Sequence, residues 1–156
     1  MVNKASRFNS VHHVLSRSYS VHLFCVIGGL ILDTIYPVHF SGVFHSNLGF
    51  FFMCIGTIFI YWAQASSSAS KKSITTGGQR NFKKGPYKYS RNPTHIGLLF
   101  VCFGFGFMIG SFFVIVFSLF AFVFTKLFFL PKEERLLEQK YGDVYSQYKK
   151  EVHTWI

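Results

Sequence analysis

Residues 96–130 read IGLLFVCFGFGFMIGSFFVIVFSLFAFVFTKLFFL, and these 35 residues carry a single charge, on Lys126. A straight helix of that length would extend ~52 Å at ~1.5 Å per residue, well beyond the ~30 Å hydrocarbon core of a bilayer. Small residues suited to a hairpin cluster near the middle of the stretch, at Gly104, Gly106 and Gly110. The stretch therefore predicts two membrane spans, residues 94–109 and 111–130.

Two further apolar runs precede this hairpin. Residues 47–64 contain no charge, and residues 22–43 form a largely apolar run that is interrupted by Asp33, Pro37 and His39. We predict one span in each run. The expected fold class is an all-α integral membrane protein with about four transmembrane helices and a C-terminal amphipathic helix in the cytosol.

Composition and charge distribution agree with a membrane protein. Half of the 156 residues are hydrophobic and 14% are charged, against about 25% charged residues in a soluble domain. The 16 Lys and Arg residues fall before residue 18, between residues 71 and 91, and from residue 126 onward. With four spans these groups share one side, which the positive-inside rule assigns to the cytoplasm together with both termini. Basic loops beside anionic lipids account for the net charge of +10, so no nucleic-acid partner is expected.

The segments outside the spans differ in character. Residues 1–20 form a basic, Ser-rich arm without acidic residues, which fits either a transit peptide or an amphipathic surface arm. Residues 21–156 form one membrane domain, and the Ser-, Gly- and Lys-rich residues 65–84 predict a loop. Residues 131–156 repeat apolar positions every three or four residues, which predicts one amphipathic helix from Pro131, or two with a break at Gly142–Asp143. The three cysteines lie apart within apolar runs, so no metal is expected.

Side chains that could form a binding site are concentrated in residues 85–97, GPYKYSRNPTHIG. Pro93 keeps Asn92 extended, and the helix that follows begins with unpaired N–H groups and a positive dipole end. Arg91, Asn92 and this helix end together suit an anion such as a carboxylate or phosphate. His95 lies one step into the span, where an ionisable side chain is by default a functional candidate.

Other residues add polar groups to the same side of the membrane. Tyr87 and Tyr89 could supply stacking faces or hydroxyls, and Glu133 and Glu134 could accept hydrogen bonds from a ribose diol or an amino group. Each residue also has a simpler explanation, such as headgroup anchoring, an aromatic belt or favourable acids at a helix start. Taken together, they predict a site for a zwitterionic cofactor.

Two separated motifs carry a resemblance to a known family. The first is the Gly-Pro-Tyr turn followed by Arg-Asn-Pro, and the second, two spans later, is a Glu-Glu pair followed by an aromatic-Gly step, two tyrosines and a terminal Trp. The chain resembles the isoprenylcysteine carboxyl methyltransferase family, most closely its small bacterial-type members and the related phospholipid N-methyltransferases. The match covers about residues 75–156, and its positions are Gly85, Pro86, Tyr87, Arg91, Asn92, Pro93, His95, Gly97, Glu133, Glu134, Leu137, Tyr141, Gly142, Tyr145, Tyr148, Val152 and Trp155.

The resemblance implies S-adenosylmethionine as cofactor, bound between the cytosolic ends of the last two spans and the C-terminal helix, with residues 75–97 as the cofactor loop. It implies a methyltransferase in which Arg91 and Glu134 carry the catalytic site. The implied cofactor-binding residues are Tyr87, Arg91, Asn92, Pro93, His95, Gly97, Glu133, Glu134, Tyr145 and Tyr148.

The sequence does not determine the methyl acceptor or the membrane in which the protein resides. The expected acceptor is lipid-like, either a prenylcysteine-type carboxylate or a phospholipid amine, and it would reach the site sideways from the bilayer. His95 stands where the family commonly has an aromatic residue, which leaves the choice of substrate open. Two alternatives remain, a non-catalytic membrane scaffold and a reductase-related enzyme using a nicotinamide cofactor. Bacterial inner membrane, endoplasmic reticulum and mitochondrion are all open, as is the oligomeric state.

Overall fold

The computed structural model describes residues 4–75 and 82–154, and residues 4–15 and 71–75 only by their helical backbone. The described part of the chain is helical without a β-strand, which confirms the all-α class. The elements are α1 (Lys4–Ile35), α2 (Val43–Thr75), the short 3-10 helix η1 (Gly85–Lys88), α3 (Pro93–Ile109), α4 (Phe112–Phe124), the π-helical turn η2 (Thr125–Phe129), α5 (Leu130–Tyr141) and α6 (Asp143–Glu151).

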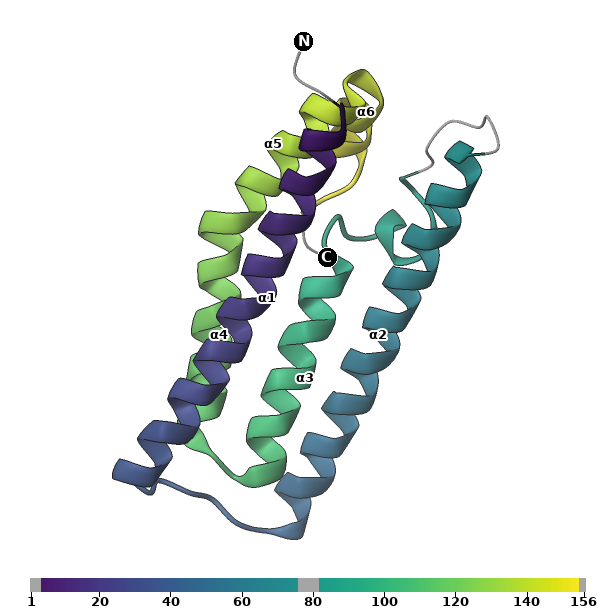
Figure 1. Ribbon diagram of the computed structural model, residues 1–156. Helices are drawn as coiled ribbons and strands as arrows, with labels where there is room; N and C mark the ends of the chain where they lie inside the picture. Colours follow the sequence, from purple (N-terminus) through teal and green to yellow (C-terminus); the bar gives the residue numbers. More distant parts are fainter. Residues whose placement is uncertain (1–3, 76–81, 155–156) are drawn as a thin grey trace.

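The helices form a bundle in which α3 lies between α2 and α4, and α1 packs along α4 (Figure 1). Within the described residues, three helical stretches are long and apolar enough to cross a membrane: Ser16–Ile35, Val43–Ser70 and Phe112–Tyr141. The remaining apolar helix, α3, has 17 residues. The four predicted spans therefore correspond to three long helices and one short one.

Glycines bring α2 and α3 unusually close. A Cβ on Gly49 of α2 would lie 2.4 Å from the backbone nitrogen of Met108, and one on Gly104 of α3 would lie 2.6 Å from the carbonyl oxygen of Gly49. Inside a bilayer, helices associate through van der Waals packing, which small residues at the contact improve. This contact fixes α3 firmly against α2.

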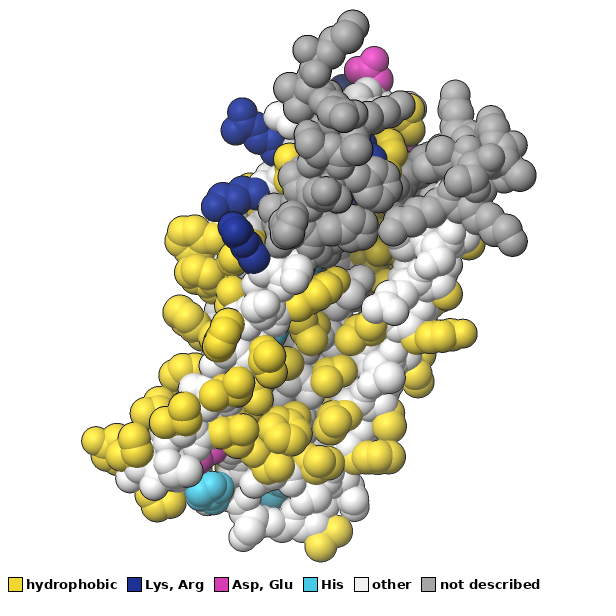
Figure 2. All heavy atoms as spheres, viewed as in Figure 1, with side chains coloured by type: hydrophobic (Ala, Val, Ile, Leu, Met, Phe, Trp, Pro, Cys, Tyr) yellow, Lys and Arg dark blue, Asp and Glu magenta, His cyan; other side chains and the backbone are white. Residues whose placement is uncertain are grey.

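α3 is much shorter than its neighbours in the bundle. At ~1.5 Å per residue, its 17 residues reach about 26 Å, whereas the 33 residues of α2 reach about 50 Å. The start of α3 therefore stops short of the ends of α2 and α5 (Figure 1). On the face drawn in Figure 2, the Lys and Arg side chains lie toward this end, and hydrophobic side chains are prominent over the rest of the bundle. We call it the charged end.

The structure corrects three boundaries. The first span was predicted to run to residue 43, but α1 ends at Ile35 because Pro37 disfavours helix before it. Most of the predicted arm, from Lys4 onward, belongs to the same helix as this span. The predicted loop 65–84 is helical as far as Thr75, since its Ser and Ala residues tolerate helix and Ser66 and Ser70 are buried. The rest of that loop up to residue 81 lies outside the described residues.

Pro131 does not start a separate helix. The backbone runs without a break from α4 through η2 into α5, and the N–H of Leu130 donates to the carbonyl oxygen of Thr125. A proline inside an α-helix clashes with the carbonyl four residues earlier, and the wider π-helical turn ahead of Pro131 relieves such crowding. The predicted C-terminal helix 131–156 is in fact α5 and α6, which are separated at Gly142, the second of the two predicted forms.

At the opposite end, a buried polar contact ties α1 to the start of α4. Ser111 caps α4 by accepting a hydrogen bond from the N–H of Val114 at 2.9 Å, and its hydroxyl donates to the carboxylate of Asp33. Both side chains are buried.

Ser111→Ala is expected to destabilise the detergent-solubilised protein by about 1–2 kcal/mol, because it removes a helix cap and leaves Asp33 without its partner. Thermal unfolding followed by circular dichroism measures this loss. Ser46→Ala is the matched control, since Ser46 is exposed and makes only a long hydrogen bond. Equal melting of the two variants would show that the cap contributes little.

Candidate functional site

A short turn carries the chain from the α2 side into the start of α3. It begins at Gly85, whose φ is +60° and where a Cβ would lie 2.0 Å from the hydroxyl oxygen of Ser66 on α2, so only glycine fits. Pro93 is the first residue of α3, where its missing N–H removes no helical hydrogen bond. Asn92 precedes it as the N-cap, yet its side chain makes no capping hydrogen bond. The Asn92 amide is thus left for another partner.

Residues 153 and 154 lie against this turn. The backbone N–H of Arg91 donates to the carbonyl oxygen of His153 at 3.1 Å, and the hydroxyl of Ser90 donates to the carbonyl oxygen of Thr154 at 3.2 Å. The Arg91 guanidinium also donates to the hydroxyl of Thr154. We call residues 152–154 the C-terminal strap, because they hold the turn that carries Arg91.

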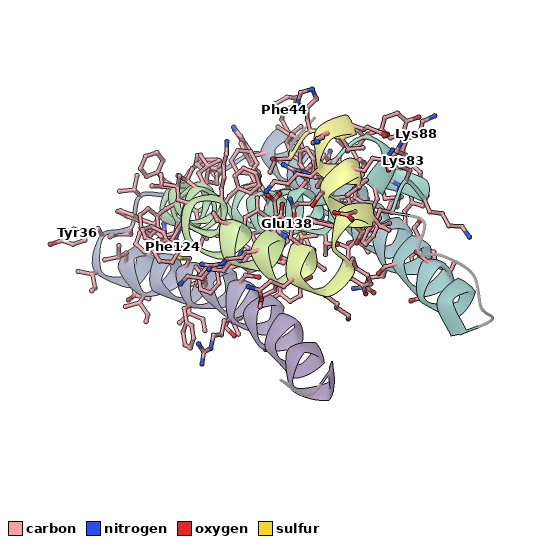
Figure 3. The ribbon with its side chains drawn as sticks, turned by 90° about the horizontal axis from the view of Figure 1, so that it is seen from above. Tyr36, Phe44, Lys83, Lys88, Phe124 and Glu138 are labelled. Carbon is pink, nitrogen blue, oxygen red and sulfur yellow. The ribbon has the colours of Figure 1, made fainter. Side chains whose placement is uncertain are left out.

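Arg91 meets Glu134 in a buried ion pair. Nη2 of Arg91 lies 3.2 Å from Oε1 of Glu134, and the two side chains are 8% and 12% exposed. Lys149 of α6 lies 3.3 Å from the other Glu134 oxygen and 2.9 Å from Glu138 at the rim, and the hydrogen bond to Glu138 is the main reason that the pKa of Lys149 is raised. Figure 3, which looks onto the charged end, places Glu138 near α6 and Lys83 and Lys88 toward α2. The turn, α5 and α6 thus meet in one charged cluster.

Several buried polar atoms around this pair make no hydrogen bond to any described residue. They are Nε and Nη1 of Arg91, Nδ2 of Asn92 and Oε2 of Glu133. Oε1 of Glu134 makes no hydrogen bond either, but it faces Nη2 of Arg91 in the ion pair. Buried polar groups are nearly always paired in native proteins, so a local group of unpaired ones calls for an explanation. Donors and acceptors that stand unpaired side by side are what a zwitterionic ligand would satisfy.

A group of buried aromatic side chains packs beside the charged cluster. Tyr145, Tyr148 and Val152 are buried together against Phe82, Leu137 and Tyr141. The hydroxyl of Tyr148 donates to the carbonyl oxygen of Tyr87 at 2.7 Å, which joins α6 to η1. Burial raises the pKa of the phenols of Tyr145 and Tyr148, so both hydroxyls stay protonated as donors at physiological pH.

His95 faces α1. Its Nε2 lies 3.2 Å from the hydroxyl oxygen of Ser18, its ring lies 5.8 Å from that of Tyr19, and its side chain is 3% exposed. Tyr19 in turn lies within electrostatic reach of Glu133 and Tyr87. The part of the site around His95 and Glu133 is therefore bordered by α1, a helix that none of the sequence motifs includes.

Gly97 faces α2. A Cβ on Gly97 would lie 2.9 Å from the carbonyl oxygen of Gly56, and one on Gly56 would lie 2.6 Å from the carbonyl oxygen of Gly97. Gly97 therefore has a helix-packing contact, and its assignment to the cofactor stays a prediction. Among the described residues, no group of three His, Cys, Asp or Glu side chains could hold a metal ion.

The predicted site residues thus divide into two sets. The structure brings the larger set together at the charged end: Tyr87, Arg91, Asn92, Glu133, Glu134, Tyr145 and Tyr148. His95 and Gly97 contact α1 and α2, and Pro93 sets the helix start. Sequence reasoning missed the groups that only the fold brings in, namely Ser18, Tyr19, Lys149 and Thr154.

The family model of phospholipid methyltransferases (PEMT) matches residues 24–144, which include α3, α4 and α5 with Arg91 and the Glu133–Glu134 pair. Searches of curated proteins and of solved structures gave no significant match. The match confirms the resemblance that the two motifs predict and supports a membrane methyltransferase of the lipid-methylating kind. The chain belongs to the phospholipid methyltransferase family.

Proposed function

We propose that this protein transfers a methyl group from S-adenosylmethionine to the amine of a phospholipid headgroup at the charged end. The observation that carries the proposal is the buried Arg91–Glu134 pair with unpaired donors and acceptors beside it. Membership of the phospholipid methyltransferase family supports the reaction class.

The residues present fit the amino-acid end of this cofactor. Nε and Nη1 of Arg91 and Nδ2 of Asn92 are unpaired donors suited to a carboxylate, and the positive end of α3 adds to them. Each oxygen of the Glu134 carboxylate faces one cation, Arg91 or Lys149, and keeps a lone pair suited to an ammonium or a hydroxyl. When bound, S-adenosylmethionine supplies an electrophilic methyl group on its sulfonium.

Charge pairing favours an amine acceptor over a carboxylate. Arg91 pairs with Glu134 and would hold the carboxylate of the cofactor with its remaining donors, and Lys149 is shared between Glu134 and Glu138. A carboxylate acceptor would need a free cation close to these groups, and the described ion pairs leave none at this cluster. An ammonium headgroup instead meets an excess of carboxylates.

The chain contributes to the rate mainly by positioning. The C-terminal strap and Glu134 hold Arg91 on two sides, and Tyr148 holds η1 to α6, so the binding groups belong to one stiff unit. Holding two reactants in line can supply a large share of a rate enhancement. The described Lys and Arg residues at this end suggest that it faces the cytoplasm, by the positive-inside rule.

The test uses the purified protein in vesicles of phosphatidylcholine with and without phosphatidylethanolamine. We expect S-adenosylmethionine to yield phosphatidyl-N-methylethanolamine, detected by mass spectrometry, only when phosphatidylethanolamine is present. A prenylcysteine added to the same vesicles should stay unmethylated. Methylation of the prenylcysteine instead would overturn the choice of acceptor, and no transfer to any lipid by folded protein would overturn the proposed activity.

A further inference from the structure

We infer that Glu133 binds the ammonium of the acceptor lipid and takes the proton that this nitrogen must lose before methyl transfer. The inference rests on the proposed function and adds a catalytic residue to it. Glu133 and Glu134 are neighbours in sequence, yet their surroundings in the structure differ, and this difference assigns them separate tasks.

Glu133 has a buried carboxylate oxygen and no cation partner among the described residues, and the other acid of this end without an ion pair, Asp143, is exposed. In the described part of the chain, Glu134 pairs with Arg91 and Lys149, Glu138 pairs with Lys149, and Glu151 pairs with Lys83. Oε2 of Glu133 is buried and makes no hydrogen bond to a described residue. A buried carboxylate without a cation is strongly disfavoured, so a cationic ligand would be bound tightly here.

The groups that face Glu133 come from three helices. Tyr19 on α1 and Tyr145 on α6 lie within electrostatic reach, as does Glu134 on its own helix α5. None of these carries a positive charge. The side chains of successive residues in an α-helix point about 100° apart. Glu134 therefore faces Arg91, and Glu133 faces Tyr19 on α1. The two carboxylates thus serve different parts of the site.

Amine methylation needs a base, because a protonated nitrogen has no electron pair to donate. Glu133 accepts one proton from the ammonium. The freed electron pair on nitrogen forms the bond to the methyl carbon of the sulfonium donor, and the carbon–sulfur bond breaks with its pair left on sulfur. The product is a methylated ammonium, and Glu133 releases one proton to water for each methyl transferred. A carboxylate acceptor would not require this step, so the unpaired Glu133 also explains a preference for amines.

The decisive variant is Glu133→Gln, which keeps the shape of the side chain but removes its charge and basicity. We expect methyl transfer to phosphatidylethanolamine to fall roughly 100-fold or more, the usual range for loss of a general base. Binding of S-adenosylhomocysteine, measured by calorimetry, should stay within about threefold of wild type. Without any methyl donor, short-chain phosphatidylethanolamine should raise the melting temperature of wild type and not that of the variant. Glu151→Gln is the matched control, because Glu151 lies in an exposed ion pair at the rim.

Two more variants guard against a trivial loss of folding. Glu133→Asp moves the carboxylate back by one methylene, and we expect a fall of about 10- to 100-fold in a folded protein. Added formate should restore part of the activity of Glu133→Ala, which a purely structural role would not permit. The inference is overturned if Glu133→Gln or Glu133→Asp keeps full activity, or if Glu133→Gln loses S-adenosylhomocysteine binding together with activity. Wild-type protein that leaves phosphatidylethanolamine unmethylated would overturn the proposed function itself, a result distinct from these.

Discussion

Glu134→Gln is expected to abolish S-adenosylmethionine binding and methyl transfer while the protein still inserts into membranes. The substitution leaves the Arg91 guanidinium buried at 8% exposure without its carboxylate. Breaking a buried ion pair by removing one partner typically costs about 3–5 kcal/mol, because the remaining charge is uncompensated. Arg91 is then expected to turn toward water, which removes the donors proposed for the cofactor. Calorimetry with S-adenosylmethionine measures the loss directly.

A double-mutant cycle separates the ion pair from general destabilisation. Arg91→Ala together with Glu134→Ala removes both charges, so the double variant should melt at a higher temperature than Glu134→Ala alone. Glu138→Gln serves as control, because Glu138 lies at the half-exposed rim, where ion pairs contribute about 0–1 kcal/mol. Retained cofactor affinity in Glu134→Gln would show that the pair is only structural.

Ending the chain after Val152 is expected to lower methyl transfer roughly 30-fold or more. The truncation removes residues 153–156, and with His153 and Thr154 it removes three hydrogen bonds to Ser90 and Arg91. Each such bond contributes about 0.5–1.5 kcal/mol net, and more when a charged group takes part. A loss of about 2 kcal/mol in fixing the turn corresponds to a factor of about 30. Steady-state rates in vesicles measure the effect.

The truncated protein should keep its fold, because Tyr145, Tyr148 and Val152 retain their packing against Phe82. Thr154→Val is the finer probe, since it removes only the hydroxyl that accepts from Arg91. We expect a smaller loss of about threefold to tenfold for this variant. A truncated protein with wild-type rates would show that the strap lies on the turn without holding it.

The sequence predicted the number and order of the apolar helices well, because hydrophobic length is the dominant constraint on membrane helices. The sequence did not predict the places where a helix continues beyond its apolar residues. Residues 65–75 are polar enough to suggest a loop, yet they extend α2, since a helix already formed needs little further stabilisation to continue. The unbroken passage through Pro131 depends on a π-helical turn that no residue pattern announces.

The motifs named residues that the fold brings together, but they did not determine which of these residues pair. The motifs placed Arg91 and the two glutamates on one side of the membrane, and the fold brings Arg91 to Glu134 specifically. The rotation of α5 about its axis decides which of the two adjacent carboxylates pairs with Arg91. The spacing of residues in the sequence does not determine this rotation. Ser18, Tyr19 and Thr154 are common residues in segments without a motif, and they join the site only through packing between distant parts of the chain.

The short third helix has a consequence for the supply of substrate. Its 17 residues reach about 26 Å, less than the ~30 Å hydrocarbon core, so Arg91 lies near the depth at which phospholipid headgroups begin. Lifting acyl chains out of a bilayer costs about 0.8 kcal/mol per methylene, on the order of 20 kcal/mol for a two-chain lipid. A site at this depth avoids that extraction, because the lipid diffuses to it within its own leaflet. Turnover should therefore follow the mole fraction of acceptor in the membrane surface and not its bulk concentration, the kinetic behaviour known as surface dilution.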